Sequence, residues 1–88
     1  MPDTYKLLIL STAAKELQSL RKPNYSRIKQ RILLLASNPR PSGSSKLTGR
    51  GGWRIRAGDY RIIYEISDED KSVTNLHIGH RRNVYKNL

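Results

Sequence analysis

The sequence predicts an α+β fold in which a helical hairpin packs on a mostly antiparallel four-stranded sheet, in the order β-α-α-β-β-β. Two early stretches place apolar residues at helical spacing. Three later stretches are short, rich in β-forming residues, and separated by turn residues. The length of 88 residues predicts one domain over residues 1–88.

The first strand is expected over residues 5–10, a mostly apolar run that reads as buried. Ser11 or Thr12 is a suitable N-cap for the helix that follows, and Glu16 lies at about capping-box distance. The helix is expected over residues 12–21, because one apolar stripe recurs there: Ala13, Leu17 and Leu20.

A second helix is expected over residues 24–37, with Pro23 ending the first helix or starting this one. Its apolar stripe has the same spacing and comprises Tyr25, Ile28, Ile32 and Leu35. A connection of about three residues predicts an antiparallel helical hairpin. Residues 38–52 are rich in Pro, Gly and Ser and are expected to form a loop.

Three strands are expected after this loop, over residues 53–57, 60–66 and 72–79. Gly58-Asp59 predicts a two-residue hairpin turn between the first two, and a polar turn over residues 67–71 precedes the third. In the last strand, alternation predicts two pairs of side chains on opposite faces: Leu76 and Ile78 against Asn75 and His77.

The two-residue turn fixes which side chains of the hairpin share a face. Arg56 then lies opposite Arg61, and Arg54 lies two residues along on the same face. The other face carries a plausible core set: Trp53, Ile55, Ala57, Tyr60, Ile62 and Tyr64. Like charges directly opposite on a sheet are unfavourable, so the arginines favour a phosphate-binding site. The alternative is a solvated face with Arg–Glu pairs, for which Glu65 supplies one partner.

The two histidines have different expected roles. His77 lies inside the last strand, where a packed or pairing histidine is the expectation. His80 follows Gly79 and precedes Arg81 and Arg82, and adjacent cations favour the neutral imidazole, which can act as a base. A nearby tyrosine could reach the same place or pack on the sheet as a C-terminal staple: Tyr85.

Charge is the strongest global signal. Lys and Arg total 17 against 7 Asp and Glu, which gives a net charge of +10. A protein with this charge typically binds nucleic acids, anionic membranes or acidic proteins. The alternative is a generic basic surface without such a partner.

Other compositional features narrow the range of sites and locations. With no cysteine and two histidines, the sequence predicts no metal site and no disulfide. The apolar run of residues 7–10 is too short for a signal peptide or membrane span, so we expect a cytoplasmic protein without a membrane partner.

Three segments together resemble the RelE toxins of the RelE/ParE superfamily: Lys46-Leu47-x-Gly49, Trp53-Arg54-Ile55-Arg56-Ala57-Gly58-Asp59-Tyr60-Arg61-Ile62-Ile63-Tyr64, and Ile78-Gly79-His80-Arg81-x-x-Val84-Tyr85. The resemblance implies the RelE-like fold and the toxin of a type II toxin–antitoxin system. It also implies a ribosome-dependent mRNA endonuclease that inhibits translation by cutting mRNA in the A site of the 70S ribosome. The implied reaction is attack by the ribose 2′-hydroxyl on the adjacent phosphate, without metal or other cofactor. The implied partners are mRNA, 16S rRNA and an acidic antitoxin, either RelB-like or from another type II family.

The resemblance also implies roles for single residues. Arg61 and Arg81 match arginines that contact phosphate, and Tyr85 matches a tyrosine beside the reacting base. Arg54 and Arg56 match basic strand residues that are lysines in well-studied members. A guanidinium is not deprotonated in proteins, so the base is expected to be His80 or Tyr85. The remaining basic residues fall in two groups: Lys46 and Arg82 for RNA or phosphate binding, and Arg27, Lys29 and Arg31 for docking on ribosomal RNA.

Two other functions fit the same sequence. A ParE-like toxin would poison DNA gyrase by protein contact, although the full basic set with a terminal tyrosine favours the RelE type. A catalytically inactive homologue would act only as a binding or repression module with its antitoxin.

Overall fold

The computed structural model describes residues 4–47 and 51–80. The elements follow the order β1 (Lys6–Ile9), α1 (Ser11–Gln18), α2 (Lys22–Leu34), β2 (Ser45–Lys46), β3 (Trp53–Ala57), β4 (Tyr60–Ser67) and β5 (Ser72–His80). The α+β class and the helical hairpin are confirmed, with α1 and α2 each ending three residues before the predicted end. The sheet has five strands instead of four, because β2 pairs with β3 inside a stretch that was expected to be loop.

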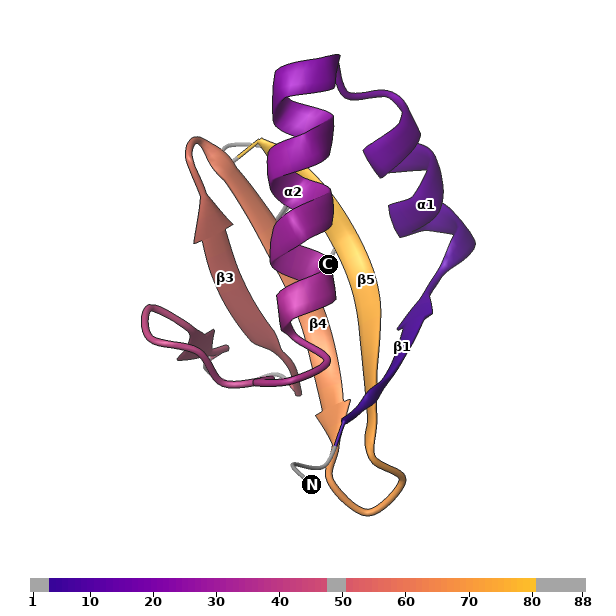
Figure 1. Cartoon of the computed structure of the whole chain (residues 1–88), viewed down its shortest axis with the longest axis vertical. Coiled ribbons are helices and arrows are strands. Elements are labelled where there is room, and N and C mark those ends of the chain that lie inside the picture. The colour runs from indigo at the N-terminus through magenta and orange to yellow at the C-terminus, as the bar shows by residue number, and fades with distance from the viewer. Residues whose placement is uncertain (1–3, 48–50, 81–88) are drawn as a thin grey trace.

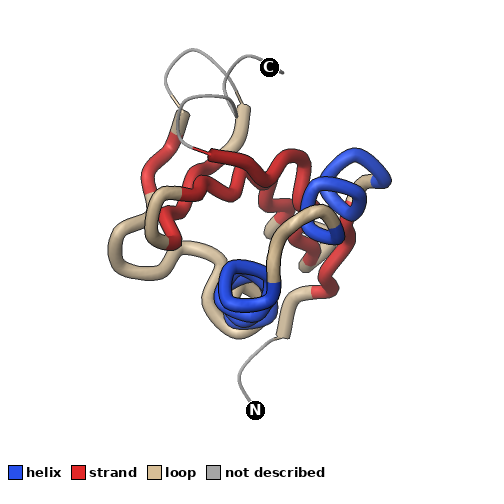
Figure 2. The backbone as a smooth tube through the Cα atoms, turned by 90° about the horizontal axis from the view of Figure 1, so that it is seen from above, coloured by secondary structure: helices blue, strands red, loops and turns tan. Residues whose placement is uncertain are grey.

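The strands lie in the order β1-β5-β4-β3-β2. β1 is parallel to β5, and the other neighbouring pairs are antiparallel. Figure 1 shows α2 crossing in front of the sheet, with α1 beside the edge formed by β5 and β1. Seen from above in Figure 2, α2 lies on one side of the strands and leaves the opposite face without a helix from the described residues.

The start of α1 differs from the prediction. Its N-cap is Leu10, without a side-chain cap, so neither Ser11 nor Thr12 has that role. The reason is that Leu10 is still held by the sheet, its backbone N–H donating to the carbonyl of Asn75 at 3.0 Å. Glu16 therefore does not take part in the predicted capping box. Its carboxylate instead accepts a hydrogen bond from the backbone N–H of Ile78 at 3.0 Å.

β1 is not buried as predicted. Leu8, Ile9 and Leu10 keep 45%, 43% and 46% of their surface exposed. β1 is the edge strand of the sheet, so it has a neighbour on one side only. Leu8 and Ile9 therefore form surface instead of core, whereas Leu7 is partly buried and packs against the core.

The core lies between the helices and the α2 face of the sheet. The predicted helix stripes supply buried side chains from α1 and α2 and the turn after α2, and the predicted hairpin face supplies the other half. The buried cluster comprises Ala13, Ile28, Ile32, Leu35, Ile55, Ala57, Ile62, Tyr64, Val73 and Ile78. Trp53 and Tyr60 pack against it while partly exposed.

A β-bulge interrupts the last strand. Ile63 pairs with His77 and Tyr64 pairs with Asn75, so Leu76 is an extra residue between two successive pairs. Residues directly opposite share a face, which places Asn75 with the core and His77 on the other face. The predicted alternation, with Asn75 and His77 together, is wrong for this reason.

One carboxylate ties three segments together at the end of the sheet where β4 turns into β5. The hydroxyl of Tyr5 donates to Asp68 at 2.6 Å, and the guanidinium of Arg40 donates to both carboxylate oxygens at 3.1 and 2.8 Å. Arg40 also lies over the ring of Trp53, 5.2 Å from its centroid. The hydrogen bonds from Arg40 and Tyr5 lower the pKa of Asp68 from 3.8 to about 2.

This pKa shift predicts how stability depends on pH. A carboxyl group with a depressed pKa in the folded state stabilises the fold above its unfolded pKa, and this contribution is lost as the pH falls through the folded value. Asp68→Asn should therefore lower the melting temperature at neutral pH, and the difference from wild type should shrink between about pH 4 and 2. Thermal unfolding followed by circular dichroism measures this, with Glu69→Gln as an exposed neighbouring control. Equal melting temperatures at neutral pH would contradict the role of Asp68.

Candidate nucleic-acid interface

The β3–β4 hairpin has the predicted register. Gly58 takes a left-handed φ of 63° in the turn, a conformation that suits glycine. All five predicted pairs form, including Arg56 opposite Arg61 and Arg54 opposite Ile63. The three arginines therefore share the sheet face that lies away from α2.

β5 extends this arrangement into two rows that cross three strands. The first row is Arg56, Arg61 and Gly79, and the second is Arg54, Ile63 and His77. We call these six residues the arginine face. Ser45 of β2 pairs with Arg54 and continues the second row, a position that sequence reasoning missed because β2 was expected to be loop.

The three arginines differ in exposure. Arg56 is exposed and Arg54 is half-buried, whereas Arg61 is only 9% exposed. Arg61 donates one hydrogen bond to the carbonyl of Tyr60 at 3.3 Å. A guanidinium carries five N–H donors in a planar fork that suits phosphate oxygens. Arg61 and Arg56 therefore place two guanidinium groups opposite each other on this face, and such groups form charge-assisted hydrogen bonds to anions.

Other predicted site residues lie elsewhere. His80 pairs with Tyr60 and shares the α2 face with it, their rings 6.0 Å apart at 77°. Lys46 is exposed and pairs with Trp53, so it also lies on the α2 face. The structure thus does not bring His80 and Lys46 together with the three arginines. The remaining predicted residues lie outside the described residues: Arg81, Arg82 and Tyr85.

The three basic residues predicted to dock on ribosomal RNA are all exposed on α2. Arg27 reaches the β3–β4 turn, where a Cβ on Gly58 would lie 3.2 Å from its Nη1 atom. Lys29 lies over the ring of Tyr25, 5.8 Å from its centroid. Arg27 and Lys29 therefore extend over different neighbours, and Arg31 follows Arg27 by four residues, which places these two arginines on the same side of α2.

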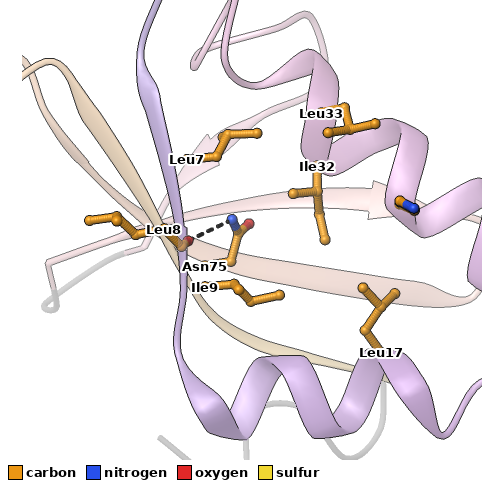
Figure 3. Close-up of a pocket in the computed structure, with 8 residues that line it drawn as sticks. Leu7, Leu8, Ile9, Leu17, Ile32, Leu33 and Asn75 are labelled. Carbon is orange, nitrogen blue, oxygen red and sulfur yellow. Dashed lines mark hydrogen bonds between the residues drawn. The ribbon is translucent and has the colours of Figure 1, made fainter.

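An apolar groove of about 200 Å³ lies between β1 and α2. Its apolar walls come from β1, α1 and α2, as Figure 3 shows. Lys29 and Asn75 also line it, and the apolar residues are Leu7, Leu8, Ile9, Leu17, Ile32 and Leu33. Asn75 is fully buried and donates to the carbonyl of Leu8 at 3.1 Å, whereas its Oδ1 has no hydrogen-bond partner in the described part of the chain. The sequence could not indicate this groove, since its leucines were read as core.

Comparison with known proteins gives one family and several similar structures. Residues 7–85 match the family described as the ParE toxin of the type II toxin–antitoxin system parDE. The archaeal RelE–RelB complex from Pyrococcus horikoshii OT3 contains a chain 36% identical to this one, with a TM-score of 0.79 over 89% of this chain and 96% of that chain.

Two bacterial complexes have similar chains at lower identity. The toxin–antitoxin complex RelBE2 from Mycobacterium tuberculosis contains a chain that is 26% identical, with a TM-score of 0.79 over 89% of this chain and 92% of that one. The intact RelBE complex of E. coli contains one that is 26% identical, with a TM-score of 0.75 over 86% and 95%. A search of curated protein sequences found no match.

The facing arginines predict a stability cost that a binding site would explain. Arg56→Gln removes one of two like charges that lie directly opposite each other, so it should stabilise the fold by a few tenths to about 1 kcal/mol. The gain should shrink as salt is added, because salt screens an exposed charge. Chemical denaturation at low and high salt measures this, with Lys46→Gln as an exposed control on the other face. A destabilised Arg56→Gln would show that the pair supports the fold.

Proposed function

This chain is a toxin of the RelE/ParE superfamily of type II toxin–antitoxin systems, and from that premise we propose that it is a ribosome-dependent mRNA endonuclease. The observation that carries the proposal is the arginine face, where Arg56 lies opposite a nearly buried Arg61. A stable fold gains nothing from this pairing. A site that holds a phosphate and the negative charge that develops on it needs such a pairing.

The chemistry assigned to this face is attack by a ribose 2′-hydroxyl on the neighbouring phosphate. The arginine side chains supply donors and positive charge to the crowded pentavalent phosphorus, which carries more negative charge than the starting phosphodiester. They cannot accept the 2′-proton, since a guanidinium stays protonated. The reaction proposed for this chain therefore uses Arg54, Arg56 and Arg61 as clamps, and needs another group for proton transfer.

The C-terminal segment would supply the remaining residues of the proposed site. Arg81 would contact the same phosphate as Arg61, Tyr85 would stack on or bond to a nucleotide, and Arg82 would bind the RNA backbone. His80 packs against Tyr60 on the α2 face, so its role as base would require the RNA to pass around the end of β5. Metal ions have no part in this proposal.

The ribosome is the proposed second component of the active site. It would hold the mRNA so that the 2′-oxygen, phosphorus and leaving 5′-oxygen lie in line, which supplies a large part of the rate. Arg27, Lys29 and Arg31 are exposed and would contact 16S rRNA from α2, with an affinity that falls steeply as salt rises. Because the ribosome aligns the mRNA in this proposal, the toxin alone should cut naked RNA poorly.

The proposed inhibitor is an acidic antitoxin. Several solved relatives are complexes of RelE with RelB, and the net charge of +10 favours an acidic partner. The groove between β1 and α2 suits an antitoxin segment with apolar side chains, because exposed leucines line it and Lys29 lies at it. A donor on that segment would satisfy the buried Oδ1 of Asn75.

The family description that matches the chain names ParE toxins, which favours gyrase inhibition as the second candidate. A ParE-like toxin would act on DNA gyrase through protein contact, and it would not need the facing arginines. The two functions predict different lesions after expression: cuts in mRNA that leave 5′-hydroxyl ends, or gyrase-dependent breaks in DNA.

Arg61→Ala tests the proposed site. It should lower the rate of mRNA cleavage on programmed ribosomes by about 10²–10³-fold, because one positioned donor group for the transition state is lost. Primer extension across the A-site codon measures the rate, and Lys71→Ala, an exposed change in the turn before β5, serves as the control. Cleavage by Arg61→Ala at the rate of wild type would contradict the assignment of the arginine face.

Leu33→Asp tests the groove. Leu33 is 55% exposed and lines the groove. A carboxylate there should weaken antitoxin binding, because it would lose its hydration against apolar side chains of the partner and repel the partner's acidic groups. Calorimetry with the cognate antitoxin measures the loss, while ribosomal cleavage should persist. Ser42→Asp, which adds the same charge in an exposed loop, is the matched control. Equal loss in both variants would mean that only overall charge matters.

A further inference from the structure

His77 and Glu16 come together at the outer edge of the arginine face. Nδ1 of His77 lies 3.8 Å from Oε1 of Glu16, and their side chains are only 19% and 24% exposed. Nδ1 is itself buried and makes no hydrogen bond within the described residues. A carboxylate that accepts a hydrogen bond from one ring nitrogen orients a histidine for proton transfer. Glu16 lies close enough to His77 for an ion pair, and a small rotation of either side chain would bring the two atoms within hydrogen-bond distance.

The bulge at Leu76 decides which face His77 occupies. Without the extra residue, His77 would share a face with Asn75, which is fully buried with the core. With it, His77 pairs with Ile63 and lies in the second row of the arginine face. Bulges next to active sites re-aim side chains in this way. His77 is then the diagonal neighbour of Arg61, at a separation of about 7–8 Å between positions.

Glu16 is held firmly enough to serve as an orienting group. Its Oε1 accepts the backbone N–H of Ile78 at 3.0 Å, beyond the point where β1 stops pairing with β5. The carboxylate thus replaces the missing strand at this edge and cannot swing away without leaving a backbone donor unpaired. Among the described residues, Glu16 from α1 lies 3.8 Å from Nδ1 of His77, and Arg54 from β3 and Arg61 from β4 are the charged groups that share its sheet face across β4.

We propose that His77 is the general base of the RNA-cutting site and that Glu16 is its positioning residue, an inference that rests on the proposed endonuclease function. The 2′-oxygen gives its proton to Nε2 of His77 as it bonds to phosphorus. The bond from phosphorus to the 5′-oxygen breaks, and that oxygen takes a proton from solvent water. The imidazolium, stabilised by Glu16, later returns its proton to solvent, and the three arginines hold the phosphate throughout.

The test is the single-turnover cleavage rate of A-site mRNA on programmed ribosomes, with the full chain. His77→Gln should lower it by about 10²–10⁴-fold, the usual contribution of a positioned base. Added imidazole should restore part of the rate to His77→Ala, because the ring's chemistry is then supplied from solution. Ser72→Ala, a small change in the same strand away from both rows, should cleave like wild type.

The role of Glu16 is tested by comparing the effect of its substitution on the cleavage rate with and without His77. Glu16→Gln keeps an oxygen for the N–H of Ile78 and removes only the charge. It should slow cleavage in the presence of His77 and add no further loss to His77→Ala. Circular dichroism and thermal unfolding of each variant confirm that the sheet edge is intact, and a purely structural role would give additive losses in both backgrounds.

The outcomes separate this inference from the function on which it rests. A wild-type protein that leaves ribosomal mRNA intact overturns the endonuclease function. A wild-type protein that cuts, with a folded His77→Gln variant that cuts within about threefold of its rate, overturns only the role of His77. The role of His77 is also overturned if His80→Gln loses activity while His77→Gln retains it, since the base would then lie on the α2 face.

Discussion

The register of three neighbouring strands is the constraint on which the rest of the structure depends. A two-residue turn at Gly58 and Asp59 sets β3 against β4, and the extra residue Leu76 sets β4 against β5. Because side chains alternate between faces, a slip of one residue would move every arginine of the hairpin into the core and its isoleucines to the surface. The core and the arginine face are therefore two results of one pairing pattern.

The two faces of the sheet serve opposite needs. On the α2 face, Ile55, Ile62 and Ile78 are buried against the helices and stabilise the fold. On the other face, like charges are placed opposite each other and Arg61 is almost buried, which lowers stability. Local rules of stability are broken mainly at functional sites, and this contrast within one hairpin is the physical reason to assign the anion site to the arginine face.

Much of this arrangement could be predicted from the sequence, because short-range patterns determine it. The Gly58-Asp59 turn gave all five pairs of the hairpin, and apolar spacing gave both helices. Long-range effects were not predictable: β1 is an edge strand, so Leu8 and Ile9 are exposed, and Leu10 remains in the sheet, so it replaces Ser11 as the N-cap. The bulge at Leu76 has no local sequence signal either, and it moves Asn75 into the core and His77 beside the arginines.

The most direct measurement is a structure of this protein on a ribosome programmed with mRNA whose A-site 2′-oxygen is methylated and cannot attack. The account predicts that the phosphate after this sugar lies within hydrogen-bond distance of the guanidinium groups of Arg56 and Arg61, with the mRNA strand on the sheet face away from α2. A phosphate bound on the α2 face, or an A site in which the arginine face contacts only ribosomal protein, would contradict it.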